Sequence, residues 1–162
     1  MTDTISVEHR SWVMSQIHSE NTKPEMLVRS FLHRNGFRFR LHVKKLPGRP
    51  DIVLAKYKTV VEVRGCFWHH HENCKSGVFP KSHSDFWIEK FRKNTERDVR
   101  NENALKELGW NVIVVWECEL KERLHDLPML IRAGAKNHDK EEIFHNIAAE
   151  PIAAYKTSPS SK

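Results

Sequence analysis

Apolar residues recur with two different spacings along the chain, and the change of spacing separates predicted helices from predicted strands. Thr22-Lys-Pro-Glu25 has the form of a capping box, in which Thr22 begins a helix and Glu25 reaches back to it. Asn35-Gly36 is a typical helix end. Four apolar residues would form the buried face of this helix: Met26, Leu27, Phe31 and Leu32.

The segments after this helix have the pattern of β-strands. In residues 37–42 apolar residues alternate with arginine and histidine, and 51–54 and 59–64 are short β-branched runs. A long charged helix is predicted at 85–108, followed by a buried strand at 110–116. With a last helix from about residue 119, this order predicts an α/β fold, a mixed central sheet flanked by helices.

Length, charge and cysteine content limit what this protein can be. The 162 residues suffice for one domain, predicted at 22–133, between an N-terminal arm, 1–21, and a partly flexible C-terminal extension, 134–162. Lys and Arg outnumber Asp and Glu by 27 to 21, a surplus whose sign suits a nucleic-acid partner, although a solvated basic surface would also explain it. No long apolar run indicates a membrane span or signal peptide, and three cysteines cannot all pair, which favours a reduced cytoplasmic protein.

The loop at 55–58 sets the register of a predicted hairpin and so brings two carboxylates together. Pairing residue 54 with 59 places Asp51 opposite Glu62, with both side chains on one face of the sheet. Arg64 follows on the same face two residues later. Two such carboxylates repel unless a cation lies between them, and their oxygens suit Mg²⁺. An exposed Asp–Glu–Arg cluster on a solvated sheet face is the alternative.

Cysteines and histidines gather after the third predicted strand. Cys66 and Cys74 lie within nine residues, and Cys118 follows the strand at 110–116. With one histidine they would form a closed Cys₃His shell, which is typical of structural zinc. Because residues 69, 70 and 71 are all histidine, the fourth ligand is left open, and at least one histidine stays available for chemistry. Three unrelated buried thiols are the alternative.

Five motifs in order give the chain a close resemblance to one family, over roughly residues 8–125. They are Leu46-Pro-Gly-Arg-Pro-Asp51, Gly65-Cys-Phe-Trp-His-His-His71, Asp85-Phe-Trp-Ile-Glu-Lys90, Lys93-Asn-Thr-Glu-Arg-Asp98 and Leu108-Gly-Trp-Asn-Val-Ile-Val-Val-Trp-Glu-Cys118. The chain resembles the very-short-patch repair (Vsr) endonucleases. This resemblance implies a restriction-endonuclease-like PD-(D/E)xK fold with a structural zinc. It also implies Mg²⁺-dependent nicking of DNA 5′ to the thymine of a T:G mismatch, which arises by deamination of 5-methylcytosine.

The resemblance also implies roles for single residues. Asp51 looks like the metal-binding carboxylate and His69 like the general base, while Glu25 looks like the acid that supports the site through metal-bound water. Helix capping would also explain Glu25. Asp51, Glu62 and Val63 form the candidate Mg²⁺ ligand set. The residues that resemble the zinc ligands are Cys66, His71, Cys74 and Cys118.

Contacts with DNA are implied for a further group of residues. Phe67, Trp68 and Trp87 resemble the aromatic residues that push into the base stack beside the mismatch, and Met14 resembles the minor-groove residue of the arm. Core packing is the alternative for Trp68 and Trp87. Lys90 and Asn94 are further candidate DNA contacts. We expect a monomer that acts in the bacterial cytoplasm at the nucleoid, with other mismatch repair proteins as further partners and no membrane association.

The chain departs from the family at positions 62 and 64 and in one loop, whereas Val63 is one of the two residues usual at its position. Relatives typically carry an apolar residue where Glu62 stands, Thr or Val at the position of Val63, and His where Arg64 stands. That histidine assists the family's catalytic centre, whereas Arg64 stays charged and would contact the phosphate instead. One extra residue lengthens the loop between His71 and Cys74. The rival functions are a restriction-type nuclease that cuts both strands and a zinc-stabilised DNA-binding module without catalysis.

Overall fold

The protein, described here from a computed structural model, folds around a four-stranded mixed sheet. The structure describes Ser6, His9, Trp12 and residues 20–72, 74–77 and 84–135. Four strands lie in the order β1-β2-β3-β4, and their bounds are Arg40–Leu41, Ile52–Leu54, Thr59–Arg64 and Asn111–Trp116. The first three strands pair antiparallel and β4 pairs parallel to β3, as the predicted mixed α/β sheet requires.

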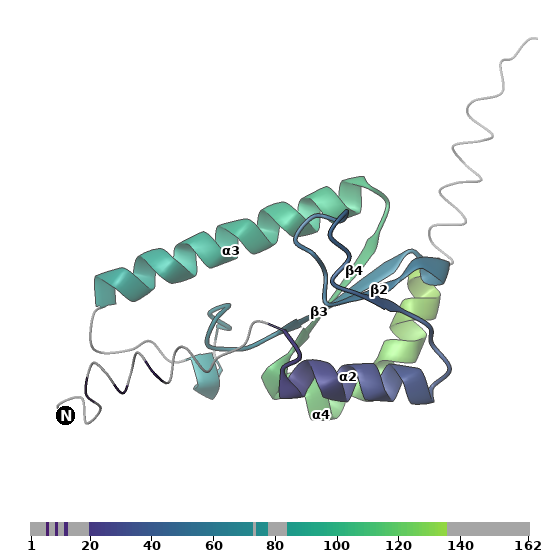
Figure 1. Ribbon diagram of the computed structural model, residues 1–162, viewed down its shortest axis with the longest axis horizontal. Coiled ribbons are helices and arrows are strands. Elements are labelled where there is room, and N and C mark those ends of the chain that lie inside the picture. The colour runs from purple at the N-terminus through teal and green to yellow at the C-terminus, as the bar shows by residue number, and fades with distance from the viewer. Residues whose placement is uncertain are drawn as a thin grey trace, which may run out of the picture.

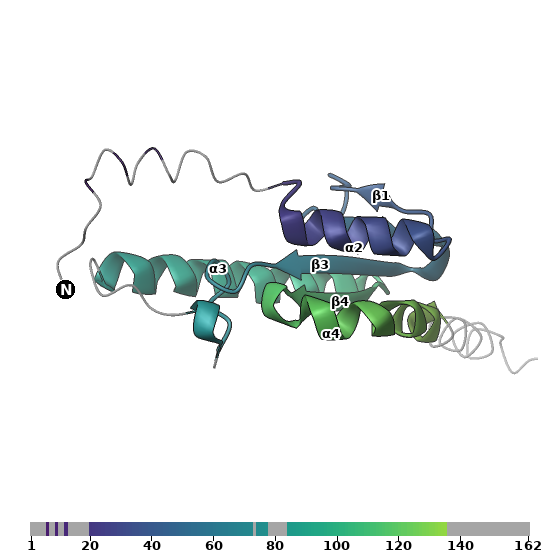
Figure 2. The same cartoon turned by 90° about the horizontal axis from the view of Figure 1, so that it is seen from below.

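Helices cover both faces of this sheet (Figure 1). On one face, α2 (Lys23–Arg34), α4 (Leu120–Arg123) and the helical residues 127–135 pack over one hydrophobic cluster, and α2 and α4 run side by side along β3 and β4 (Figure 2). The cluster consists of Val28, Leu32, Phe37, Ile52, Leu54, Val61, Ile113, Val115, Leu120, Leu127 and Ile131. On the other face, the long helix α3 (Ser84–Glu107) packs Leu105 against Val53 and Val60.

Sequence and structure agree closely on α2 but differ on which of its residues are buried. The Thr22 hydroxyl accepts a hydrogen bond from the Glu25 N–H, and Asn35 ends the helix, as the capping pattern predicts. The prediction that Met26 and Leu27 are buried is wrong, because their exposed fractions are 51% and 55%. The buried stripe instead follows the spacing i, i+3, i+4, i+7 and consists of Glu25, Val28, Arg29 and Leu32. Two charged residues, Glu25 and Arg29, therefore lie on the buried face of the helix, which the sequence pattern assigns to apolar residues at other positions.

The hairpin between β2 and β3 has the predicted register. Leu54 pairs with Thr59, Val53 with Val60 and Ile52 with Val61. The connecting residues form a 3₁₀ turn, Ala55–Tyr57, that Lys58 closes with a φ of 45°.

Two predicted elements are shorter or less regular than expected. The strand predicted over 37–42 is reduced to the two residues of β1, because only these pair with β2. The helix predicted from about residue 119 is interrupted, since α4 lies between the 3₁₀ turns Glu117–Glu119 and Leu124–Asp126. Among the described residues, none of the helices is long and apolar enough to cross a membrane.

Candidate active site

A buried carboxylate, Glu25, and a half-buried one, Asp51, meet where the first turn of α2 approaches the start of β2. Glu25 and Asp51 lie with His42 so that one ligand atom from each falls within 4.8 Å of the others. The backbone N–H of Val63 donates a 2.8 Å hydrogen bond to Asp51 Oδ2. His42 Nδ1 lies 3.9 Å from the other oxygen, Oδ1. Carboxylate oxygens at this spacing can hold a hard divalent cation.

The electrostatics of Asp51 favour the binding of a cation. Burial is the main cause that raises the pKa of Asp51 to about 6, and the negative charges of Glu25 and Glu62 act in the same direction. The hydrogen bond from Val63 and the His42 ring work against this rise. A buried carboxylate next to other carboxylates is costly to ionise, and a bound Mg²⁺ ion would remove that cost. The donor set therefore fits the metal that the sequence predicts.

Glu62 and Arg64 contact each other on β3. Arg64 Nη2 lies 2.5 Å from Glu62 Oε2 and 2.7 Å from Glu102 Oε1, which comes from α3. Although burial opposes its charge, the two carboxylates raise the pKa of Arg64, so that the guanidinium stays protonated. The carboxylate grouped with Asp51 at the metal-sized spacing is thus Glu25 rather than Glu62. The β2–β3 register is nevertheless the predicted one.

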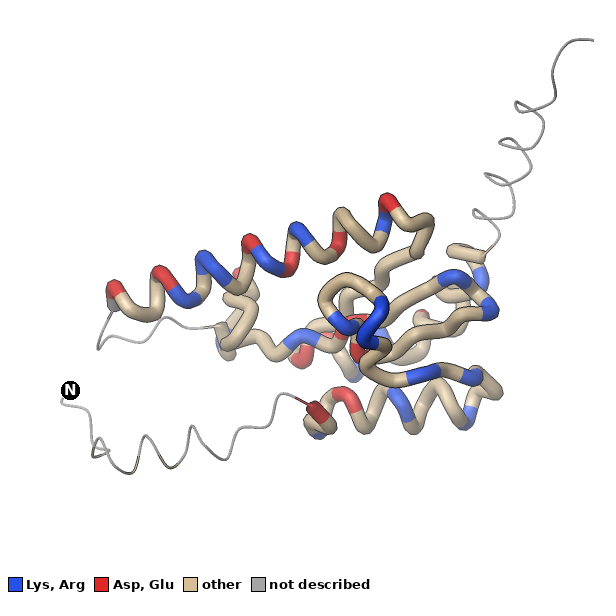
Figure 3. The backbone as a smooth tube through the Cα atoms, turned by 45° about the horizontal axis from the view of Figure 1, so that its top comes forward, with Lys and Arg blue, Asp and Glu red and all other residues tan. Residues whose placement is uncertain are grey.

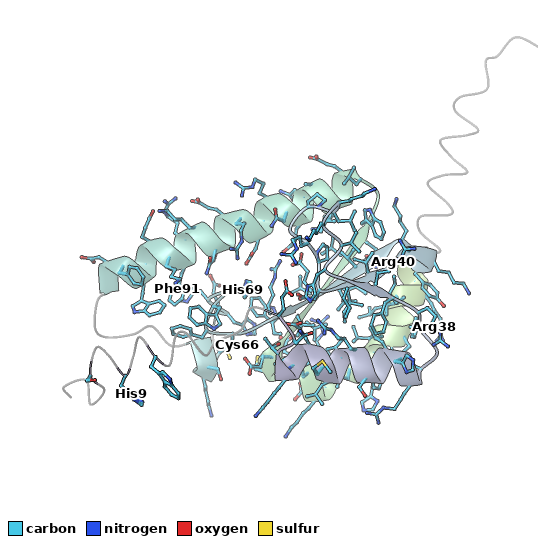
Figure 4. The ribbon with its side chains drawn as sticks, in the orientation of Figure 1. His9, Arg38, Arg40, Cys66, His69 and Phe91 are labelled. Carbon is cyan, nitrogen blue, oxygen red and sulfur yellow. The ribbon has the colours of Figure 1, made fainter. Side chains whose placement is uncertain are left out.

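His69 is held by a carboxylate from α3. Its Nδ1 atom lies 2.5 Å from Asp98 Oδ2. Figure 4 shows His69 between α3 and the end of β3. Burial alone would raise the pKa of Asp98, but the hydrogen bond and charge of His69 and the charge of Arg64 lower it below its ordinary value. Asp98 therefore stays a carboxylate, which accepts a hydrogen bond from the ring N–H.

The three cysteines converge with one histidine at the far end of β3 and β4. One ligand atom each from Cys66, His71, Cys74 and Cys118 lies within 4.8 Å of the others. The His71 Nδ1 atom lies 3.3 Å from the sulfur of Cys118 and 3.7 Å from that of Cys66. The backbone N–H of Ser76 is the main cause that lowers the pKa of Cys74 to about 7. Three thiols and an imidazole at this spacing fit a tetrahedral zinc ion.

The backbone separates the three consecutive histidines into three environments. The His71 ring stacks on Trp116, with centroids 4.1 Å apart and planes 2° apart. His70 has a φ of 48° and stacks on Phe91 instead, with centroids 5.3 Å apart. Among the three, only His71 joins the cysteines, and His69 is directed to its carboxylate on α3.

Aromatic residues from the loop after β3 and from the start of α3 form one half-buried platform. The ring centroid of Phe67 lies 5.1 Å from that of Trp68 and 5.1 Å from that of Trp87. Lys90 Nζ lies 5.4 Å from the centroid of Trp68 and 5.7 Å from that of Trp87. Asn94 donates a 2.9 Å hydrogen bond to the Trp68 carbonyl, so it holds this loop rather than facing away from it.

Acidic and basic residues are distributed unevenly along the chain (Figure 3). Acidic and basic residues alternate along α3, whereas the segment between β1 and β2 carries the basic residues Lys44, Lys45 and Arg49. Met14, the predicted minor-groove residue, lies outside the described residues.

Comparison with known proteins places this arrangement in one family. Residues 2–76 match the family described as DNA mismatch endonuclease Vsr. A type II nicking enzyme of Neisseria meningitidis, V.NmeAIP, is 57% identical over 123 residues, which cover 76% of this chain and 87% of that enzyme. The DNA mismatch endonuclease Vsr of Escherichia coli K12 is 43% identical over 123 residues, 76% of this chain and 78% of the relative. The chain belongs to the Vsr family.

Membership of the Vsr family confirms the resemblance that the five motifs predict. The chain is a nicking DNA endonuclease, a hydrolase that acts on phosphodiester bonds, and DNA is its substrate. A further relative, the type II nicking enzyme V.XorIIP of Xanthomonas oryzae, is 52% identical over 122 residues, 75% of this chain and 89% of the relative. A DNA-binding module without catalysis is thereby set aside.

Sequence reasoning missed four polar residues that surround the Vsr site. Asp98 ends the fourth motif, and its approach to His69 depends on how α3 crosses the sheet. Glu102 follows one helical turn later and reaches Arg64. Arg29 and His42 lie beside Glu25, and a signal for Arg29 was available, since its spacing of four residues from Glu25 places both on one helix face.

Proposed function

We propose that this Vsr-family enzyme nicks one strand of DNA 5′ to the thymine of a T:G mismatch, with Mg²⁺ at Asp51, and so begins very-short-patch repair. The observation that carries the proposal is the half-buried carboxylate of Asp51 beside Glu25, whose raised pKa of about 6 makes Asp51 costly to ionise without a cation. The fold would be a restriction-endonuclease-like one, in agreement with the mixed sheet. The E. coli relative carries the words DNA mismatch endonuclease in its name, which supports the mismatch as substrate.

The metal would be held by Asp51, with Glu25 nearby and the Val63 carbonyl and Glu62 as further candidate ligands. When bound, Mg²⁺ supplies charge stabilisation for the phosphate oxygens. Arg64 would contact the scissile phosphate, as its permanent charge allows. In the structure the Arg64 guanidinium contacts Glu62. Metal binding by Glu62 and phosphate contact by Arg64 both require this ion pair to open on DNA.

His69 would act as general base toward the attacking water. Asp98 accepts a hydrogen bond from the Nδ1–H group, and the neutral ring then presents the lone pair of Nε2. Because Asp98 is a carboxylate with a lowered pKa, it also stabilises the imidazolium that forms when the ring takes a proton. This pairing of a histidine with a buried carboxylate resembles the base–orienter arrangement of other hydrolases.

The aromatic platform would recognise the mismatch by entering the base stack. A mismatched step is less costly to open than a paired one, and stacking on an aromatic ring stabilises an exposed base by about 1–3 kcal/mol. Phe67, Trp68 and Trp87 are half-buried and packed edge to face, which keeps them rigid while part of each ring stays accessible. Lys90 would place a cation beside the phosphates, and Met14 would insert from the arm.

A structural zinc would hold the platform in place. Cys66 and His71 flank Phe67 and Trp68, and Cys118 ties this loop to the end of β4. We propose that the enzyme acts as a monomer in the bacterial cytoplasm, where chromosomal DNA and other mismatch repair proteins are its partners.

The test compares three DNA substrates with Mg²⁺ and with EDTA: a labelled T:G duplex, the same duplex with T:A, and supercoiled plasmid. We expect a nick only in the thymine strand of the T:G duplex and only with Mg²⁺. Asp51→Asn is the matched inactive control. A linear plasmid product would instead establish a restriction-type enzyme that cuts both strands, and equal nicking of T:A would refute mismatch specificity.

A further inference from the structure

A buried arginine lies beside the two carboxylates of the candidate metal site. Arg29 is only 6% exposed and lies on the buried stripe of α2. Its Nη2 atom lies 2.6 Å from Glu25 Oε2 and 3.0 Å from His42 Nε2, and its Nη1 atom lies 2.5 Å from Asn21 Oδ1. One guanidinium therefore contacts an acid in the first turn of α2, an amide just before that helix and an imidazole after β1.

The backbone conformation of two of these partners of Arg29 is also unusual. Asn21 has a φ of 60° and His42 a φ of 45°, so both partners of Arg29 outside α2 adopt the left-handed region. This region is uncommon for residues other than glycine and is maintained only where surrounding contacts hold it.

The chemistry of the guanidinium determines the state of His42. Arginine has five N–H donors and no acceptor, so His42 Nε2 must be the acceptor in the 3.0 Å contact. The single ring hydrogen of neutral His42 then lies on Nδ1. This atom is the one that faces Asp51 Oδ1, at 3.9 Å. His42 thus directs an N–H group, not a lone pair, toward the metal-binding carboxylate.

We propose that Arg29 fixes His42 as its Nδ1–H tautomer and that His42 is a positioning residue for Asp51 rather than a metal ligand. The inference rests on the proposed function, in which Asp51 binds the metal. The distance of 3.9 Å is longer than a direct hydrogen bond, so His42 acts on Oδ1 electrostatically or through one shared water. Val63 donates to Oδ2, and the two donors together set the orientation of the carboxylate.

This arrangement has a consequence for metal choice. A Glu–His–Asp group would ordinarily suit transition metals, because imidazole favours them over Mg²⁺. Since neither ring nitrogen of His42 has a free lone pair, the Glu25–His42–Asp51 cluster offers the ion only oxygen ligands. His42 therefore keeps the site selective for hard cations although it belongs to the ligand-sized cluster.

The tautomer is measured directly by ¹H–¹⁵N NMR of the full chain labelled with ¹⁵N-histidine. His42→Gln identifies the His42 signals by their loss. We expect the Nδ1–H form in the wild type and a shift toward the Nε2–H form, which predominates in the free histidine side chain, in Arg29→Met. An Nε2–H ring in the wild type overturns the proposal. The wild-type spectrum decides this even where Arg29→Met does not fold.

Mn²⁺ binding separates positioning from ligation. Electron spin-echo spectra of the Mn²⁺ complex are compared with and without His42→Gln, both in a His69→Ala background so that the His69 ring does not contribute. We expect no nitrogen coupling that is lost in His42→Gln. We expect His42→Leu to weaken Mn²⁺ binding severalfold, and His42→Gln, whose amide also offers N–H, to restore it. A nitrogen coupling lost in His42→Gln, or a His42→Leu protein with unchanged affinity, overturns the proposal. If Asp51→Asn also leaves Mn²⁺ affinity unchanged, the proposed metal role of Asp51 fails instead.

Discussion

His69 Nδ1 lies 2.5 Å from Asp98 Oδ2, so the loop after β3 and the middle of α3 are joined at one ring nitrogen. A carboxylate can only accept, and the ring must therefore donate its Nδ1 hydrogen. In the neutral ring this leaves Nε2 as the basic atom. The geometry thus selects both the tautomer and the direction in which His69 can take a proton.

The first prediction concerns Asp98. Asp98→Asn should lower the single-turnover nicking rate by at least about tenfold, because an amide can donate to Nδ1 and move the ring hydrogen to Nε2. His69→Ala should lose more, in the range of about 10²–10⁴ that general bases contribute. Duplex binding should change little in either protein. An Asp98→Asn enzyme with the wild-type rate would separate Asp98 from catalysis.

The second prediction concerns the pH dependence of stability at Asp51. Because the folded-state pKa is raised to about 6, the protonated carboxyl stabilises the fold below about pH 4, and this stabilisation is lost as pH rises through 6. Without Mg²⁺ at pH 8, Asp51→Asn should be more stable than the wild type by up to about 2–3 kcal/mol. The difference should vanish near pH 4 and shrink when Mg²⁺ is added to the wild type.

Urea unfolding of both proteins at pH 4 and pH 8, with and without Mg²⁺, measures this difference. Comparison of the two proteins removes the contribution of the cysteines, which titrate in both. Equal stability at pH 8 would show that Asp51 ionises in the fold without cost.

The third prediction concerns the cysteine–histidine cluster. Purified protein should contain roughly one zinc per chain, and Cys118→Ser should lose both the metal and the native fold. His71→Ala should also lose zinc, whereas His70→Ala, the matched control one residue away, should keep it, since His70 stacks on Phe91 instead. Metal analysis and thiol titration measure both. Three freely reactive thiols in native, metal-free protein would contradict the site.

The fourth prediction concerns Trp68. Trp68→Ala should weaken binding to the T:G duplex far more than binding to the T:A duplex, because only the opened step accepts the ring. Trp110→Ala is the control, since Trp110 packs with the core beneath α3 and should cost stability without changing the preference between duplexes. Equal losses on both duplexes in Trp68→Ala would mean that Trp68 only packs.

The fifth prediction concerns Glu62. If Glu62 leaves Arg64 and assists Asp51 on DNA, Glu62→Gln should need much more Mg²⁺ for the same nicking rate. The matched control is Glu102→Gln, which removes the other partner of Arg64 from α3 and should leave the Mg²⁺ requirement unchanged. An unchanged rate and Mg²⁺ dependence in Glu62→Gln would show that Glu62 and Arg64 form only an ion pair.

Local patterns were enough for several parts of this molecule. The Thr22–Glu25 capping box, the end of α2 at Asn35 and the β2–β3 register all follow from a few adjacent residues, because caps and tight turns are determined by short-range hydrogen bonds. The cysteine spacing likewise predicted the four-residue cluster, although it left the choice among three histidines open.

Tertiary packing decided which polar groups meet. The β2–β3 register, continued by one residue, leads to Asp51 and Glu62, but Glu62 contacts Arg64, and the carboxylate grouped with Asp51 is Glu25 from α2. The pairs Arg29–His42 and His69–Asp98 join segments 13 and 29 residues apart. Such pairs depend on how α2 and α3 cross the sheet, because a long polar side chain takes the best partner that packing brings within reach. Periodicity along the chain determines the elements, but it carries no information about that choice.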